Sequence, residues 1–238
     1  LYLSKIFNKQ DKKNLEEQNL NTAILLNPKN EEALYNLAKL KLSSSDYKKS
    51  LEYPESRFLI SQIDIANQNE VKDSIQKGIE KFGKITMQVN NAGASIFSPW
   101  FERSAEEIDL TMNVNLKGTF YCISEFLKAA KSQNINSVIV NVASHYGLIS
   151  PDPRIYKNLK RRNSEIYGAT KAGIIQMTKY FAANSLHDGF NTRINAVAPG
   201  GIFNPKHPQS KDFIKEYSSR VPLKRMGETE EVVKPILF

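Results

Sequence analysis

The chain has 238 residues, a formal net charge of +8 and an apolar fraction of 40%. This length predicts one or two globular domains, and no apolar run approaches the roughly 18 residues that a membrane-spanning helix needs. The charge fits either a solvated basic face or an anion site, but the basic residues are too dispersed to predict nucleic-acid binding.

The first 53 residues are predicted to be helical and contain no glycine. A turn at Pro28 is followed by a new helix at Glu31–Ala38, whose apolar residues share one stripe. This segment resembles a partial tetratricopeptide repeat, and a generic helical hairpin is the alternative. Because such repeats bury their apolar faces only by stacking, one and a half of them cannot form an ordinary solenoid. We expect a helical domain at 1–53 and a second domain at 54–238.

From Pro54 onward the pattern changes to alternating strands and helices, which predicts an α/β fold with a doubly wound parallel sheet. The predicted strands are Phe58–Asp64, Ile85–Val89, Ser137–Val142 and Thr192–Ala198. The predicted helices are Asn67–Phe82, Ala105–Lys131 with a bend near Asn113–Asn115, Ser164–Asn184, Asp212–Tyr217 and Glu230–Phe238. Cys122 is the only cysteine and falls in an apolar stretch, which predicts a buried, inert thiol in a reducing, cytoplasmic protein.

Tyr167 and Lys171 lie four residues apart in a predicted helix, so their side chains share one face. An ammonium beside a phenol favours the phenolate, which would make Tyr167 an acid–base group near neutral pH. Most such pairs are surface pairs, so the surroundings decide. Ligands of open α/β sheets bind beyond the carboxyl ends of the strands, where four further segments would meet this pair. These segments are Asp64, Asn90–Gly93, Ser144 and Pro199–Ile202.

From about Phe58 to Phe238 the chain resembles the short-chain dehydrogenase/reductase family through five motifs in the family's order. The motifs are Asn90–Gly93, Asn113–Gly118, Asn141–Gly147, Tyr167-x-x-x-Lys171 and Pro199–Ile202. One such motif would be weak, but five in order are specific. The resemblance implies an oxidoreductase that transfers a hydride between NAD or NADP and a carbonyl or alcohol of a small-molecule substrate.

The resemblance also implies a role for each matched residue, and no metal. Tyr167 would exchange a proton with the substrate oxygen, and Lys171 would lower the pKa of Tyr167 and bind the nicotinamide ribose. Ser144 would polarise the substrate carbonyl, and Asn115 would hold the water or backbone geometry of a proton relay. For Asp64 the implied role is an adenine contact, and a helix cap is the alternative. The implied cofactor-binding residues are Asp64, Asn91, Ala92, Gly93, Tyr167, Lys171, Pro199, Gly200 and Ile202.

The chain departs from the family before the first motif. Its first glycine is Gly78, so the family's glycine-rich phosphate turn, its first two strands and its cofactor-selecting residue have no match. The family's last strand would follow Phe238. We therefore expect weak or no cofactor binding by these 238 residues. Either Phe58–Asp64 or the repeat-like helices would have to cover the free edge of Ile85–Val89. A gene fusion, a partial reading frame and a decayed paralogue all fit, and a fragment is favoured.

The connection between Ser144 and Tyr167 is longer than is usual in the family and holds a basic cluster. The cluster consists of Lys157, Lys160, Arg161 and Arg162. It suits an anionic sugar or nucleotide-sugar of surface-polysaccharide or flagellin-glycan synthesis, and an unspecified alcohol or ketone is the alternative. The resemblance further implies a homo-oligomer, with neither nucleic acid nor membrane as partner. The second hypothesis is a non-catalytic interaction protein that uses its repeat-like helices.

Overall fold

The computed structural model describes residues 59, 61–156, 163–205 and 209–237. The predicted helical domain at 1–53 and the basic cluster at 157–162 lie outside the described residues. The strands are β1 (Met87–Asn90), β2 (Ser137–Val142) and β3 (Thr192–Val197). The α-helices are α3 (Gln68–Phe82), α4 (Ala105–Met112), α5 (Thr119–Ser132), α6 (Glu165–Asn184), α7 (Lys211–Arg220) and α8 (Thr229–Leu237). Short helical turns are η4 (Trp100–Glu102), η5 (Asn113–Gly118), η6 (His145–Gly147) and η7 (Pro153–Ile155).

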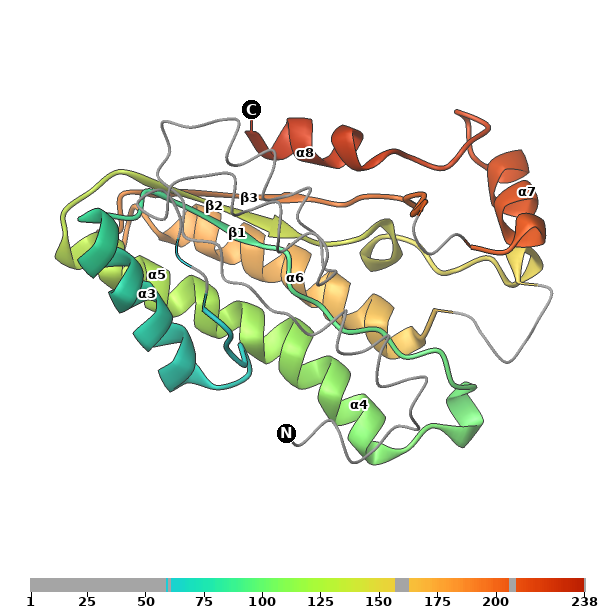
Figure 1. Ribbon diagram of the computed structural model, residues 1–238, viewed down its shortest axis with the longest axis horizontal. Coiled ribbons are helices and arrows are strands. Elements are labelled where there is room, and N and C mark those ends of the chain that lie inside the picture. Colours follow the sequence, from blue (N-terminus) through green and yellow to red (C-terminus); the bar gives the residue numbers. More distant parts are fainter. Residues whose placement is uncertain (1–58, 60, 157–162, 206–208, 238) are drawn as a thin grey trace.

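The described part of the chain forms a parallel sheet in the order β1-β2-β3. The central strand β2 is apolar and rich in β-branched residues, as expected of a parallel strand that is covered on both faces. Helices α3, α5 and α6 lie on one side of the sheet and α8 lies on the other (Figure 1). The predicted α/β fold with a parallel sheet is thereby confirmed.

Three predicted strands differ from the observed ones, and the last differs only because β3 ends at Val197, one residue before the predicted Ala198. The strand predicted at Ile85–Val89 is observed as β1 at Met87–Asn90, with Ile85 buried just before it. The strand predicted at Phe58–Asp64 is wrong in its described part, which forms no strand beyond a single bridge position at Gln62. A short apolar run becomes a strand only when a neighbouring edge binds its backbone, and the described residues give this run no place in the sheet.

The long helix predicted at Ala105–Lys131 is continuous, but its middle is a π-helical turn, η5 at Asn113–Gly118. The capping box of Ser104 and Glu107 starts α4, and α5 continues beyond η5 to Ser132. A π-helical turn inserts one residue into the backbone ladder and often marks a functional site. Here it occupies the predicted bend.

The main core lies between the sheet and helices α3 and α5, where Phe126 and Ile139 are almost completely buried. Each such side chain contributes about 1.5–3 kcal/mol by leaving water. Cys122 is buried in the same core, and burial raises the pKa of its thiol to about 12, in agreement with the predicted inert role. Within the described ranges, none of the helices has the length and apolar composition of a bilayer span.

Candidate active site

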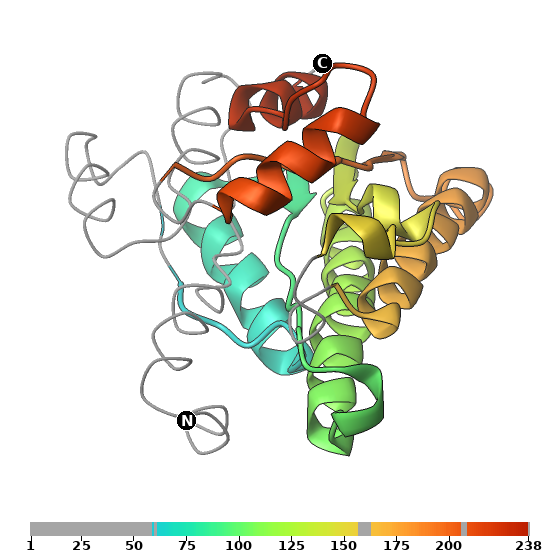
Figure 2. The same ribbon diagram turned by 90° about the vertical axis from the view of Figure 1, so that its right-hand side faces the viewer.

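The carboxyl ends of the strands open toward α7, and Figure 2 looks onto this edge of the sheet. The chain leaves β2 at Val142 and forms η6, and it leaves β3 at Val197 and enters the loop Pro199–Ile202. The first turns of α6 pack against η6 and η5. Side chains from β2, η5 and α6 are thereby brought to one place.

Tyr167 lies in the first turn of α6, which begins at the cap residue Ser164. The Ser164 hydroxyl accepts a hydrogen bond from the Tyr167 N–H at 3.0 Å. The side chain of Ser144, the residue that caps η6, acts on the Tyr167 phenol as a hydrogen-bonding neighbour that lowers its pKa. The predicted serine and tyrosine are therefore neighbours in the fold, although 23 positions separate their numbers in the sequence.

The pKa of Tyr167 differs from the sequence expectation. Burial raises the pKa of this phenol above its ordinary value of 10.0, and the hydrogen bond with Ser144 acts in the opposite direction. The predicted lowering of the Tyr167 pKa by Lys171 therefore does not dominate. The lysine Nζ lies 5.6 Å from the centre of the tyrosine ring. At neutral pH the phenol is protonated, so it can donate a proton.

Lys171 is buried with only 4% of its surface exposed. Its Nζ donates a hydrogen bond of 2.8 Å to the carbonyl oxygen of Val142, the last residue of β2. A buried ammonium is costly unless it is hydrogen-bonded, so this carbonyl fixes where the charge lies. The charge sits beside Gly93, where an added Cβ would come to 3.6 Å from Nζ.

Asn115 lies in the π-helical turn and is completely buried. Its Oδ1 accepts a hydrogen bond from the Ala94 N–H at 2.7 Å. Its Nδ2 donates to the Ala94 carbonyl at 2.9 Å and to Thr170 Oγ1 at 3.0 Å. The side chain therefore ties the turn after β1 to α6, one residue before Lys171.

Two glycines border this assembly, and the first of them is required by close backbone packing. An added Cβ at Gly147 would lie 2.7–2.9 Å from backbone atoms of Lys171 and Ala172, so only glycine lets η6 touch α6. At Gly93 the nearest atoms would be Asn115 Oδ1 at 3.4 Å and Lys171 Nζ at 3.6 Å, which leaves space beside both groups.

Buried and half-buried amides connect β1 and β2 with α6. Gln88 donates to Asn90, Asn90 donates to Asn141 at 2.7 Å, and Asn141 donates to Thr178 of α6 at 2.9 Å. Because each side chain in this hydrogen-bonded series has a partner, the series fixes the relative positions of β1, β2 and α6. It also gives the first asparagine of the Asn90–Gly93 motif a structural role.

The structure places the remaining predicted residues as follows. Asn91 is exposed, whereas Ala92 packs against the main core. The carbonyl of Pro199 accepts a hydrogen bond of 2.9 Å from the His145 N–H, and Ile202 forms a parallel bridge with Gly227.

Asp64 is exposed and does not cap α3, because the helix begins at the cap residue Asn67. Its carboxylate instead accepts a hydrogen bond from the Ala66 N–H at 2.9 Å, which makes a local turn. The helix-cap interpretation of Asp64 is therefore wrong, and its adenine contact stays a prediction.

Sequence reasoning missed three residues that touch this site. Thr170 bonds Asn115, His145 bonds the Pro199 carbonyl, and Tyr217 of α7 bonds the Gly201 N–H. No local pattern signals the contact of Tyr217 with Gly201, because it joins two separate segments of the chain.

The described residues fit one end of a dinucleotide. Gly93 leaves space beside Lys171 Nζ and Asn115, and the Ser144–Tyr167 pair faces the same strand ends, which suits a nicotinamide ribose and a substrate oxygen. A glycine-rich turn for the pyrophosphate is not found among the described residues, where the first glycine is Gly78. The same ranges hold no group of three or more His, Cys, Asp or Glu side chains that could bind a metal.

Comparison with known proteins agrees with this geometry. A family model described as enoyl-(acyl carrier protein) reductase matches residues 34–238. A 3-oxoacyl-[acyl-carrier-protein] reductase FabG from Thermotoga maritima is 36% identical over 177 residues, which cover 74% of this chain and 67% of the relative. The chain thus spans about two thirds of the length of this relative.

Two solved structures have the same fold. A short chain dehydrogenase from Leptospira borgpetersenii with bound NAD+ has a TM-score of 0.68 and 35% identity, over 75% of this chain and 66% of that one. A gluconate 5-dehydrogenase from Burkholderia cenocepacia in complex with NADP and tartrate has a TM-score of 0.64, over 74% of this chain and 65% of that one. Its 22% identity makes it a likeness of fold alone.

Proposed function

The chain belongs to the short-chain dehydrogenase/reductase family of oxidoreductases, and we propose that its site reduces a carbonyl to an alcohol at the expense of NADH or NADPH. The observation that carries the proposal is the close packing of η6 on α6, which brings Ser144 near Tyr167, with the buried ammonium of Lys171 one turn further along α6. A fixed pair of hydroxyl donors stabilises the charge that develops on a substrate oxygen.

The cofactor would supply the hydride, and the chain supplies the proton and the geometry. The Tyr167 phenol is protonated at neutral pH because burial raises its pKa, so it donates a proton to the substrate oxygen. The Ser144 hydroxyl donates a hydrogen bond to the same substrate oxygen. After the proton transfer it can donate to the Tyr167 phenolate instead. Lys171, held by the Val142 carbonyl, stabilises that phenolate through its positive charge.

Asn115 acts on the backbone of the site. Because it bonds both polar groups of Ala94, it holds the turn after β1 open beside Gly93, where the ribose would lie. Its bond to Thr170 keeps this turn in register with α6 and therefore with Tyr167 and Lys171. This supports the backbone-holding alternative of its predicted role.

For the substrate we propose a 3-oxoacyl thioester, because the similar curated proteins include 3-oxoacyl reductases. The sugar or nucleotide-sugar prediction rests in part on Arg161 and Arg162, which lie outside the described residues, and it stays a prediction. In the described part of the same connection, Arg154 pairs with Asp152 at 2.8 Å, so this guanidinium is already engaged.

The test is turnover by the purified 238-residue chain with acetoacetyl-coenzyme A, with NADH and NADPH each titrated into the millimolar range. We expect oxidation of the reduced cofactor and formation of the 3-hydroxyacyl thioester. If neither this thioester nor a panel of simple ketones and keto-sugars is reduced, the proposal is wrong and the interaction-protein hypothesis is favoured. The cytoplasmic setting also stays a prediction.

We also propose that the 238-residue chain binds the cofactor weakly. The support is the absence of any glycine before Gly78, since backbone N–H groups of a glycine-rich turn normally hold the pyrophosphate. In a fluorescence titration, saturation by NADH or NADPH is expected only at millimolar concentration. A submillimolar dissociation constant would contradict this.

A homo-oligomer that pairs through α4, α5 and α6 is proposed from the same resemblance. The support is that Phe120 on α5 is 43% exposed and Met112 on α4 is 37% exposed, although both side chains are apolar. Gel filtration of the chain and of Phe120→Lys tests this. A dimer that Phe120→Lys converts to a monomer is expected, and a monomer in both cases would refute it.

A further inference from the structure

Tyr217 is the buried tyrosine of α7, and it reaches the loop that follows β3. Its hydroxyl oxygen accepts a hydrogen bond of 2.6 Å from the Gly201 N–H. This loop, Pro199–Ile202, is the segment for which a nicotinamide contact is implied. The tyrosine therefore joins a helix that lies in front of the strand ends to the cofactor side of the site (Figure 2).

The two glycines of the loop are shaped to this ring. An added Cβ at Gly201 would lie 2.8 Å from Tyr217 Cζ, and one at Gly200 would lie 2.9 Å from its hydroxyl oxygen. Real Cβ atoms do not approach so closely, so any other residue would move either the loop or the ring. The Tyr217 ring and hydroxyl are thus packed closely against both Gly200 and Gly201.

A second residue holds the same loop from the catalytic side. His145 directly follows Ser144, and both its backbone N–H and its ring Nδ1 lie within hydrogen-bond distance of the Pro199 carbonyl, at 2.9 and 3.0 Å. The imidazole also meets Tyr217 edge-on, with ring centres 6.5 Å apart. The loop is thus held at Pro199 by His145 and at Gly201 by Tyr217.

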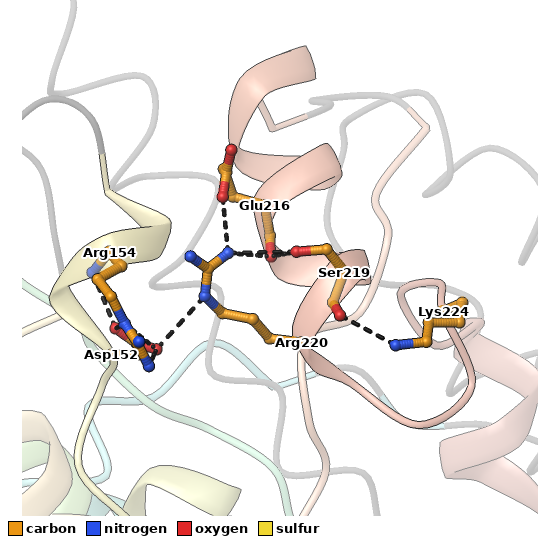
Figure 3. A network of polar contacts seen from close by, with 6 residues as sticks. All are labelled: Asp152, Arg154, Glu216, Ser219, Arg220 and Lys224. Carbon is orange, nitrogen blue, oxygen red and sulfur yellow. Dashed lines mark hydrogen bonds and ion pairs between the residues drawn. The ribbon is translucent and has the colours of Figure 1, made fainter.

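Helix α7 is itself fixed to the segment that precedes the basic cluster. Ile155 of η7 is buried with Tyr217 in a small hydrophobic cluster of its own. Figure 3 shows Arg220 at the end of α7 between Asp152, at 3.5 Å, and Glu216, at 2.6 Å. Lys224 Nζ donates to the Ser219 carbonyl at 3.0 Å and closes the turn after the helix.

From these contacts we infer that Tyr217 is a positioning residue: its hydroxyl fixes the Gly201 N–H and thereby the loop that faces the nicotinamide. The inference rests on the function proposed above. The connection between Ser144 and Tyr167 gains a role as well. Its turn η7 packs against α7, and α7 holds the loop Pro199–Ile202 through Tyr217. Cofactor geometry therefore depends on a helix on the substrate side of the site.

The experiment compares the 238-residue chain with Tyr217→Phe, which keeps the ring and removes only the hydroxyl. Hydrogen exchange of the Gly201 amide, measured by nuclear magnetic resonance, is expected to accelerate about two- to tenfold in Tyr217→Phe, as loss of one hydrogen bond predicts. Tyr180→Phe is the matched control, because this substitution also removes a phenolic oxygen, but from a side chain that is 59% exposed. It should leave Gly201 exchange unchanged.

In the turnover assay, Tyr217→Phe should raise the KM for the reduced cofactor by about the same two- to tenfold, with kcat at saturating cofactor within about twofold. Gly201→Ala should also raise this KM, because its Cβ would lie 2.8 Å from Tyr217 Cζ and would displace either the loop or the ring.

Unchanged Gly201 exchange in Tyr217→Phe would overturn the inference. If Tyr217→Phe does not fold, the unaltered chain gives the answer: a Gly201 amide that exchanges at the unprotected rate overturns it, and a protected one supports it. The exchange measurement needs no turnover. A failure of the proposed function, seen as no ketone reduction, is therefore distinguishable from a failure of this contact.

Discussion

Gly147→Ala is expected to separate η6 from α6 and so to weaken both the fold and the site. The added Cβ would lie 2.7 Å from the Lys171 carbonyl carbon and 2.8 Å from the Ala172 nitrogen. Ordinary contact begins near 3.4 Å, so one backbone must retreat by about 0.7 Å. No side chain can absorb this by changing rotamer, since the atoms that are met belong to the main chain.

The cost follows from two opposing effects. Overpacking of this kind costs about 1–3 kcal/mol, and replacing glycine by alanine recovers about 0.4–1 kcal/mol by restricting the unfolded chain. We therefore expect a net loss of about 1–2 kcal/mol in the free energy of unfolding. Because Ser144 lies on the displaced segment and Tyr167 on α6, turnover should fall by about 10- to 100-fold, as a misplacement approaching 1 Å does elsewhere.

Urea unfolding followed by circular dichroism measures the first effect, and ketone reduction measures the second. Gly93→Ala is the matched control for stability, because its Cβ would meet nothing closer than 3.4 Å. Gly147→Ala with the stability and turnover of the unaltered chain would refute the reasoning that η6 and α6 are in backbone contact.

Three further predictions concern buried polar groups. Asn115→Ala removes three hydrogen bonds and leaves both polar groups of Ala94 without this partner, so urea unfolding should show a loss of about 3 kcal/mol, and a loss below about 1 kcal/mol would contradict the account. Ser144→Ala removes the hydrogen bond that lowers the pKa of Tyr167, so the alkaline limb of the pH profile for ketone reduction should move to higher pH, and a shift to lower pH would be inconsistent with the assigned contact. For Glu125, burial raises the pKa, but hydrogen bonds from Lys128 and Gln68 outweigh it and hold the pKa below its ordinary 4.5. Its stabilising contribution is therefore full above pH 4.5 and lost as pH falls through the lowered pKa, and the stability difference between the unaltered chain and Glu125→Gln should shrink in acid.

Elements with a strong local pattern could be predicted from the sequence. β2 is observed at the predicted residues because six mostly β-branched and apolar residues fit only a buried strand. α3 ends where Gly83 adopts a φ of 79°, a left-handed conformation that glycine adopts readily, and the predicted helix ended there as well. The strand predicted at Phe58–Asp64 is wrong in its described part, because strand formation depends on a partner edge, which no local pattern encodes.

The site residues also fall into those that the sequence predicts and those that it does not. The Ser144, Tyr167 and Lys171 set follows from spacing and resemblance, and the structure brings the three together. The contact of Tyr217 with Gly201 could not be predicted, because it joins two segments through a hydrogen bond that leaves no periodic trace. The predicted lowering of the Tyr167 pKa was wrong in direction. Burial, which depends on the whole fold, raises this pKa and dominates over the lysine four residues away.

The central claim is that Tyr167 delivers the proton, and the most direct measurement is the turnover number of Tyr167→Phe beside that of Tyr180→Phe. Both changes remove one phenolic oxygen from α6, but Tyr167 lies near Ser144 whereas Tyr180 is exposed. Loss of a general acid should lower ketone reduction about 10²- to 10⁴-fold in Tyr167→Phe, with Tyr180→Phe within about twofold of the unaltered chain. Equal turnover in the two variants would contradict the account.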